Sequence, residues 1–179
     1  LEGRVVAREQ IGSGLVAPFV NTPNVLKASP SANRVLAHCT LSLAIAKQVA
    51  KRGGAKVNDV MLAAIDIAMS RYIEERSSPP DAPLVADVPV ALQDHGGTGN
   101  RITILQVPMG LPGSKPAERL QRIVNETQQM KREVRVLSGD SLMIYSILEH
   151  SLASTIESLR LGELPMLANV VISNPAGFT

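Results

Sequence analysis

The stretch "GGAKVNDVMLAAIDIAMSRYI", residues 53–73, predicts a long helix running from about residue 59 to about residue 76. Its apolar residues recur at helical spacing over a wide stripe, so we expect much of the helix to be buried. The predicted inner positions are Val57, Met61, Leu62, Ala64, Ile65, Ala68, Met69 and Tyr72. The predicted polar side, which is narrow, consists of Asp66, Ser70, Glu74 and Glu75.

Two adjacent polar residues, Asn58 and Asp59, stand at the front edge of this helix and have two interpretations. They could form a functional site. Alternatively, Asn58 is the N-cap and Asp59 interacts with the positive end of the helix dipole. Val57 and Leu62 have the spacing of a hydrophobic staple across that cap. Because capping explains both polar residues, it is the favoured interpretation, and losing the cap should cost about 1 kcal/mol.

Strands and helices alternate loosely along the rest of the chain. Residues 34–42 predict a strand with Val35, Ala37, Cys39 and Leu41 on one face. A short helix over 43–52 should stop at the two following glycines. Further strands are predicted over 84–92, 100–109 and 166–173, and one or two helices within 139–161. This order predicts an α/β fold in which a mixed β-sheet is covered by helices.

A long helix is predicted to begin at Pro116, where the missing N–H of proline costs little. Its predicted inner face is Leu120, Ile123, Val124, Thr127, Met130 and Val134, and its predicted outer face is Arg119, Arg122, Glu126, Lys131 and Arg132. Pro89, within the 84–92 strand, indicates an edge position or a bulge.

Composition excludes several classes of protein. The chain has 179 residues, of which 45% are hydrophobic and 19% charged, and a formal charge of +2. The scattered cations and scarce aromatics argue against nucleic-acid binding, which uses basic grooves with stacking platforms. The single cysteine excludes an internal disulfide and a multi-cysteine metal site. No apolar run is long enough to span a bilayer, and no signal peptide is visible.

Few residues outside the Asn-Asp pair suggest chemistry. His38, His95 and His150 have no metal-binding spacing and no catalytic motif, although His95 lies in a Gly-rich loop. Cys39 is predicted in mid-strand among apolar neighbours, which favours a packed, inert thiol. The "GGTGN" stretch, residues 96–100, precedes a strand rather than a helix, so it is interpreted as a turn. We therefore predict no metal site.

Four segments, in order, resemble motifs of the bacterial wax ester synthase/acyl-CoA:diacylglycerol acyltransferase (WS/DGAT) family. They are "GGAKVNDVMLAAIDIAMSRYI", "PLVADVPVAL", "GNRITILQVPM" and "LANVVISNPAG". The resemblance covers roughly residues 24–177. Its motif residues are Asn58, Asp59, Gly99, Asn100, Ser173, Asn174 and Gly177, and it implies a structural role for them. The last motif departs from the family form, Ser-Asn-x-Pro-Gly, because Pro175 follows Asn174 directly.

The resemblance implies one lobe of a two-lobed fold similar to chloramphenicol acetyltransferase. The family's catalytic His-His-x-x-x-Asp-Gly motif belongs to the N-terminal lobe, and this sequence has no adjacent histidine pair. Residues 1–33 are therefore interpreted as a linker or crossing segment, and residues 34–179 as an incomplete C-terminal lobe, inactive by itself. No catalytic residue is expected within the segment. Met143, Ile144 and Ile147 are candidates to line a substrate tunnel, with ordinary core packing as the alternative.

The implied reaction moves a fatty acyl group from acyl-CoA, a substrate rather than a cofactor, to a long-chain alcohol or a diacylglycerol. The expected partners are the N-terminal catalytic lobe and these substrates, with a homodimer possible. The expected location is the cytoplasm, with at most peripheral contact with the inner membrane or lipid inclusions. Two alternatives remain: a condensation-domain relative that uses carrier-protein thioesters, and a non-catalytic assembly module.

Overall fold

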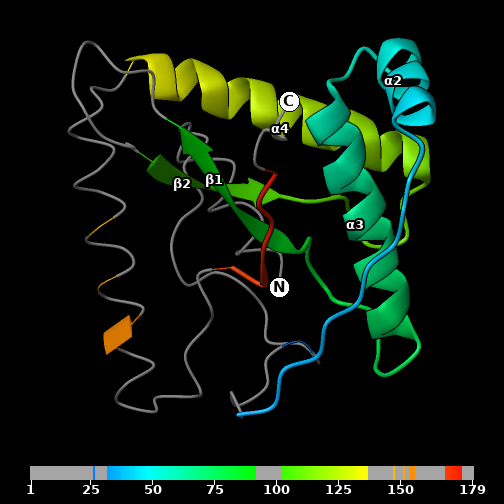
Figure 1. Cartoon of the computed structure of the whole chain (residues 1–179), viewed down its shortest axis with the longest axis vertical. Helices are drawn as coiled ribbons and strands as arrows, with labels where there is room; N and C mark the ends of the chain where they lie inside the picture. Colours follow the sequence, from blue (N-terminus) through cyan, green and yellow to red (C-terminus); the bar gives the residue numbers. More distant parts are fainter. Residues whose placement is uncertain are drawn as a thin grey trace.

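The computed structural model describes residues 26, 32–91, 102–136, 147, 151, 154–155 and 168–174. The elements, in order, are α2 (Leu43–Arg52), α3 (Val57–Glu74), β1 (Val85–Ala91), β2 (Ile102–Pro108), α4 (Pro116–Val136) and β3 (Val170–Val171). Figure 1 shows α4 running across one end of the molecule, α3 descending along one side, and the strands between them. The predicted α/β class with a mixed sheet is confirmed for the described residues.

The sheet has the order β2-β1-β3, with β1 in the centre. β1 and β2 are antiparallel from Val85 opposite Pro108 to Ala91 opposite Ile102. β1 and β3 are parallel, with Ala86 opposite Val170. The edge position predicted from Pro89 is therefore wrong for the strand as a whole. The backbone N–H and carbonyl of Val85 bond to Asn169, on the β3 side of β1. Backbone groups alternate in direction along a strand, so the nitrogen of Pro89, four residues later, also faces away from β2. The proline therefore removes no hydrogen bond between β1 and β2.

The helices α3 and α4 cover one face of this sheet. Alternate residues of the two long strands enter a common core with Leu62 and Ile73 of α3 and Ile123 of α4. The core residues of these strands, with one residue adjoining each strand, are Leu84, Ala86, Val88, Leu105, Val107 and Met109. The inner face predicted for the long helix is confirmed at Leu120, Ile123, Val124, Thr127 and Met130; the side chain of Val134 lies outside the described residues.

α2 confirms the helix predicted over 43–52. The Ser42 hydroxyl accepts a hydrogen bond from the N–H of Ile45 at its start, and Gly53 ends it. The next residue, Gly54, has φ of 61°, a backbone conformation that a residue with a Cβ adopts only at a cost. The side chain of Gln121 then donates to the carbonyl of Gly53, which fixes α4 against the end of α2.

The face predicted for α3 is partly wrong. Asp66 and Ser70, predicted on the polar side, are buried, whereas Ala64, Ala68 and Tyr72, predicted inside, are exposed. The buried positions are Asp59, Leu62, Ala63, Asp66, Ser70 and Ile73. The helix has apolar residues on nearly all sides, so the apolar pattern did not single out one face. The orientation of α3 is decided by polar partners on α4, Thr127 for Asp59 and Arg119 for Asp66.

The strand predicted over 34–42 is also wrong for this chain: residues 33–42 form neither helix nor strand. Cys39 is exposed rather than packed, and His38 is exposed as well. A strand needs a neighbour to receive its backbone hydrogen bonds, and no described strand lies beside this segment. The final strand is shorter than predicted, covering two residues of the 166–173 range.

Candidate functional site

The first candidate is the Asn-Asp pair, which the structure places inside α3 rather than at its cap. The N-cap is Lys56, so the N-cap role predicted for Asn58 is wrong. Asp59, at the third helical position, reaches back and accepts a hydrogen bond of 2.8 Å from the backbone N–H of Lys56. A carboxylate there satisfies one of the unpaired N–H groups of the first turn and faces the positive end of the dipole.

The second oxygen of Asp59 joins α3 to α4. Thr127 donates its hydroxyl to Asp59 Oδ1 at 3.0 Å, and the two residues are only 3% and 6% exposed. Both carboxylate oxygens are therefore occupied by protein donors. A general base must have an oxygen free to take a proton from its substrate, so this arrangement favours a structural role for Asp59.

Asn58 connects to another motif residue far along the chain. Its Oδ1 accepts a hydrogen bond of 3.1 Å from Nδ2 of Asn174, 116 residues later. The exposed Ser173 and Asn174 lie two and three residues after the end of β3. Thus the structure brings together the start of α3 and the end of the last described strand, two segments that the sequence singles out separately.

Most of the remaining predicted site residues fall outside the described residues. Gly99, Asn100 and Gly177 lie outside the described residues, as do Met143 and Ile144 of the predicted tunnel and the histidines His95 and His150. Ile147, the third tunnel candidate, is 57% exposed.

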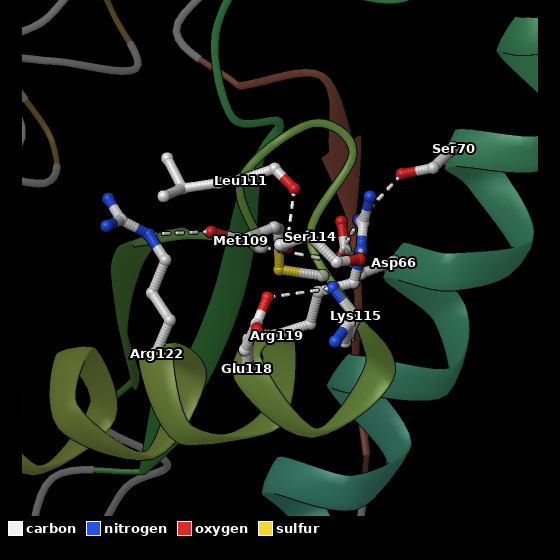
Figure 2. Close-up of polar contacts among 10 residues, drawn as sticks. Asp66, Ser70, Met109, Leu111, Ser114, Lys115, Glu118, Arg119 and Arg122 are labelled. Carbon is white, nitrogen blue, oxygen red and sulfur yellow. Dashed lines mark hydrogen bonds and ion pairs between the residues drawn. The ribbon is translucent and has the colours of Figure 1, made fainter.

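A second polar cluster, which sequence reasoning missed, lies deeper in the structure (Figure 2). Arg119 of α4 donates from Nη1 to Asp66 Oδ2 at 2.7 Å and to Ser70 Oγ at 2.9 Å. The side chains of Arg119 and Asp66 are 6% and 0% exposed, so this is a buried ion pair. The outer position predicted for Arg119 is wrong, because its guanidinium is the partner that allows Asp66 and Ser70 to be buried.

The backbone at Gly110 completes this cluster. Its N–H donates to Asp66 Oδ2 at 3.1 Å. A Cβ at position 110 would lie 2.4 Å from Arg119 Cγ and 2.6 Å from Asp66 Oδ2, so only glycine allows the close approach. Burial raises the pKa of Asp66 above its ordinary value, while Arg119 and the Gly110 N–H oppose that rise.

The turn between β2 and α4 is held by the same arginine and its neighbours (Figure 2). Arg119 Nε donates to the carbonyl of Ser114 at 3.1 Å, and the Ser114 hydroxyl donates to the carbonyl of Leu111. Arg122 donates to the carbonyl of Met109 at 3.0 Å. The cluster therefore fixes how α4 leaves the sheet and packs on α3, which is a positioning function.

The opposite face of the sheet carries two polar side chains side by side, Asp87 and Gln106, which are register partners on β1 and β2. Both are buried, at 7% and 6% exposure. The amide of Gln106 makes no hydrogen bond in the described part of the structure. No group of three or more potential metal-ligating side chains occurs among the described residues.

A signal for the missed cluster does exist in the sequence. Asp59, Asp66 and Ser70 fall at spacings of seven and four, so they share one stripe of the helix with Leu62, Ala63 and Ile73. Polar residues interleaved with large apolar ones on one stripe indicate buried polar contacts. Their partners, Thr127 and Arg119, are 68 and 53 residues away, and pattern analysis of one segment does not identify partners at such distances.

Comparison with known proteins defines the class. Residues 98–177 match the WS/DGAT C-terminal domain family. Residues 98–177 therefore belong to the WS/DGAT C-terminal domain family, which confirms the resemblance found in the four motifs. No solved structure matches it.

Among the curated relatives is a probable diacylglycerol O-acyltransferase of Mycobacterium tuberculosis, 40% identical over 152 residues, which are 83% of this chain and 32% of that protein. A putative diacylglycerol O-acyltransferase of the same species is 30% identical over 97% of this chain and 40% of its own length. The O-acyltransferase WSD of Acinetobacter baylyi is 28% identical over 90% of this chain and 36% of its own length. The chain thus spans about a third of the length of these relatives.

The hydropathy of the helices adds one further observation. Within the described ranges, no helix combines the length and the apolar character needed to cross a bilayer.

Proposed function

We propose that the full-length protein containing this chain is an O-acyltransferase that moves a fatty acyl group from acyl-CoA to a long-chain alcohol or a diacylglycerol. The observation that carries this proposal is the match to the WS/DGAT C-terminal domain, together with relatives whose names give diacylglycerol O-acyltransferase and O-acyltransferase. The products would be wax esters or triacylglycerols.

The chemistry follows from the substrates. A general base takes the proton of the acceptor hydroxyl as its oxygen attacks the thioester carbonyl, and the tetrahedral intermediate expels the CoA thiolate. The proposed base is a histidine of the N-terminal lobe, outside this chain. Two observations support that placement: the sequence has no adjacent histidine pair, and Asp59 already accepts bonds on both oxygens.

In this proposal the chain supplies a wall of the substrate tunnel rather than reacting groups. Its two buried polar clusters would hold α3, α4 and the sheet in one arrangement, so that the wall keeps its shape. Met143, Ile144 and Ile147 are proposed tunnel residues because flexible apolar side chains suit an acyl or alkyl chain. The proposed location is the cytoplasm, with peripheral contact with the inner membrane or lipid inclusions.

The test is an ester-formation assay with the full-length protein. Purified protein is incubated with radiolabelled palmitoyl-CoA and either hexadecanol or dioleoylglycerol, and the lipid products are separated by thin-layer chromatography. We expect labelled wax ester or triacylglycerol from the full-length protein and none from residues 1–179 alone. Ester formation by this chain alone would contradict the placement of the base.

Two parallel incubations separate the alternatives. Product from an acyl carrier-protein thioester, without product from palmitoyl-CoA, would identify the condensation-domain alternative. Absence of product from both donors, in a protein shown to be folded by circular dichroism, would favour a non-catalytic module.

A further inference from the structure

The region before and within α2 exposes far more apolar surface than the rest of the described structure. Val35 and Leu36 are 97% and 94% exposed, and Leu41 is 70% exposed. The exposure continues into α2, where Leu43, Ile45 and Val49 are 57%, 62% and 39% exposed. Scattered exposed apolar residues are ordinary, but six large ones within residues 35–49 indicate an interaction surface.

The sequence of this region has the pattern of a strand. From 35 to 41, which we call the 35–41 segment, Val35, Ala37, Cys39 and Leu41 alternate with Leu36, His38 and Thr40. One face is wholly apolar and the segment contains no Lys, Arg, Asp or Glu, which are the usual protections of a free strand edge. Nevertheless, none of the strands in the described part of the structure pairs with it.

The described sheet of this chain does not serve as the partner. In Figure 1 the segment leaves the start of α2 and passes α3, and it does not follow any of the three strands. Ser42, at its end, has φ of −72° and ψ of 112°, so the chain enters α2 in an extended conformation. Extended backbone with exposed apolar side chains is suited to addition to another sheet edge.

We propose that the 35–41 segment is a β-strand that pairs with a sheet edge in the part of the full-length protein outside this chain. The adjoining apolar residues of α2 then pack against the same lobe. The relatives cover this region within proteins about two and a half to three times as long, so the remaining chain is available as the occupant. A tethered partner has a high effective concentration, which favours it over a second copy of the protein.

Pairing of the 35–41 segment is separate from the acyltransfer reaction and is measured without it. Hydrogen exchange is measured by mass spectrometry on the full-length protein and on residues 1–179 alone. We expect amides of the 35–41 segment to exchange at least about 100-fold more slowly in the full-length protein than in the chain alone. Peptides from α3 serve as the protected standard and peptides covering 77–83 as the exposed standard.

Cys39 provides an independent readout, because it is the only cysteine of this chain and is exposed within it. N-ethylmaleimide should modify Cys39 at least about tenfold more slowly in the full-length protein than in the chain alone, as read from the Cys39 peptide. Rapid amide exchange in the full-length protein would overturn the proposal. Protection that is already present in the chain alone would also overturn it. Protection that disappears on dilution would overturn it too, because loss on dilution identifies a second copy of the protein as the partner.

Discussion

The two carboxylates buried on α3 are satisfied to different extents: both oxygens of Asp59 accept hydrogen bonds, whereas Oδ1 of Asp66 has no partner among the described residues. Asp59, at the start of the helix, is satisfied by the Lys56 N–H and the neutral hydroxyl of Thr127. Asp66, two turns later, depends on the charged guanidinium of Arg119. Both link α3 to α4, but only the first lies in a recognisable motif. The comparison teaches that a residue in a family motif and a residue outside any motif can have the same structural task, which is to join the two helices.

The largest expected effect is from Arg119→Met, which removes the charged partner and leaves Asp66 buried without it. Breaking a buried ion pair by removing one partner typically costs about 3–5 kcal/mol. The free energy of unfolding is measured by urea denaturation. Lys131→Met, an exposed cation on the same helix, is the control and should change it by less than about 0.5 kcal/mol. Equal effects of the two variants would contradict the importance of the Asp66 pair.

Gly110→Ala should come next, because its Cβ would collide with Arg119 and Asp66. Overpacking of this kind costs about 1–3 kcal/mol. The matched change is Gly53→Ala, whose nearest atom is the movable end of Leu120 at 2.9 Å, so its cost should be smaller. Thermal unfolding of both variants provides the comparison, and a larger loss at Gly53 would show that the cluster around Arg119 is looser than described.

Thr127→Val tests the hydrogen bond between the neutral Thr127 hydroxyl and Asp59. The change keeps the shape of the side chain but removes the hydroxyl that bonds to Asp59, leaving a buried carboxylate oxygen without a donor. We expect a loss of about 2 kcal/mol, less than for Arg119→Met. Thr155→Val, at an exposed position, is the control. A loss larger than that of Arg119→Met would reverse the ranking of the two clusters.

Asp66 should also make the stability of the fold depend on pH. The pKa of Asp66 is raised by burial above the ordinary value of 3.8, so the folded state holds this proton more tightly than the unfolded chain does. Its contribution to stability is therefore present at low pH and declines as pH rises from 3.8 towards the raised pKa. Asp66→Asn should remove this decline from the stability–pH curve, whereas the exposed Asp81→Asn should not. If the slope of the stability–pH curve is the same in Asp66→Asn as in the unchanged protein, the pKa of Asp66 is not raised in the folded state.

The smallest effect is expected from Asn174→Ala, which removes the bond to Asn58 at an exposed position. A hydrogen bond of this kind contributes about 0.5 kcal/mol. Ser173→Ala, at the neighbouring exposed residue, should be neutral. Thermal unfolding distinguishes the two, and equal melting temperatures would show that the contact between the motif segments contributes nothing to stability.

The sequence predicted those parts of the fold that local patterns determine. The inner face of α4, the stop of α2 at its glycines and the two long strands all follow from periodicity and turn chemistry. The orientation of α3 was not predicted correctly, because its apolar residues surround the helix and its buried polar stripe resembles a solvated one. The strand over 34–42 failed for a different reason: strand propensity is realised only when a neighbouring strand is present.

Asp59→Asn in the full-length protein tests the central claim most directly, namely that the Asn-Asp segment holds α3 and α4 together and performs no proton transfer. The measurement is kcat for ester formation from palmitoyl-CoA and hexadecanol, per folded molecule, alongside the free energy of unfolding. Asparagine keeps one acceptor oxygen but cannot act as a base. We predict reduced stability and a kcat within about threefold of the unchanged protein. A fall of about 10²–10⁴-fold in kcat with stability unchanged, the size expected for loss of a general acid or base, would contradict the claim.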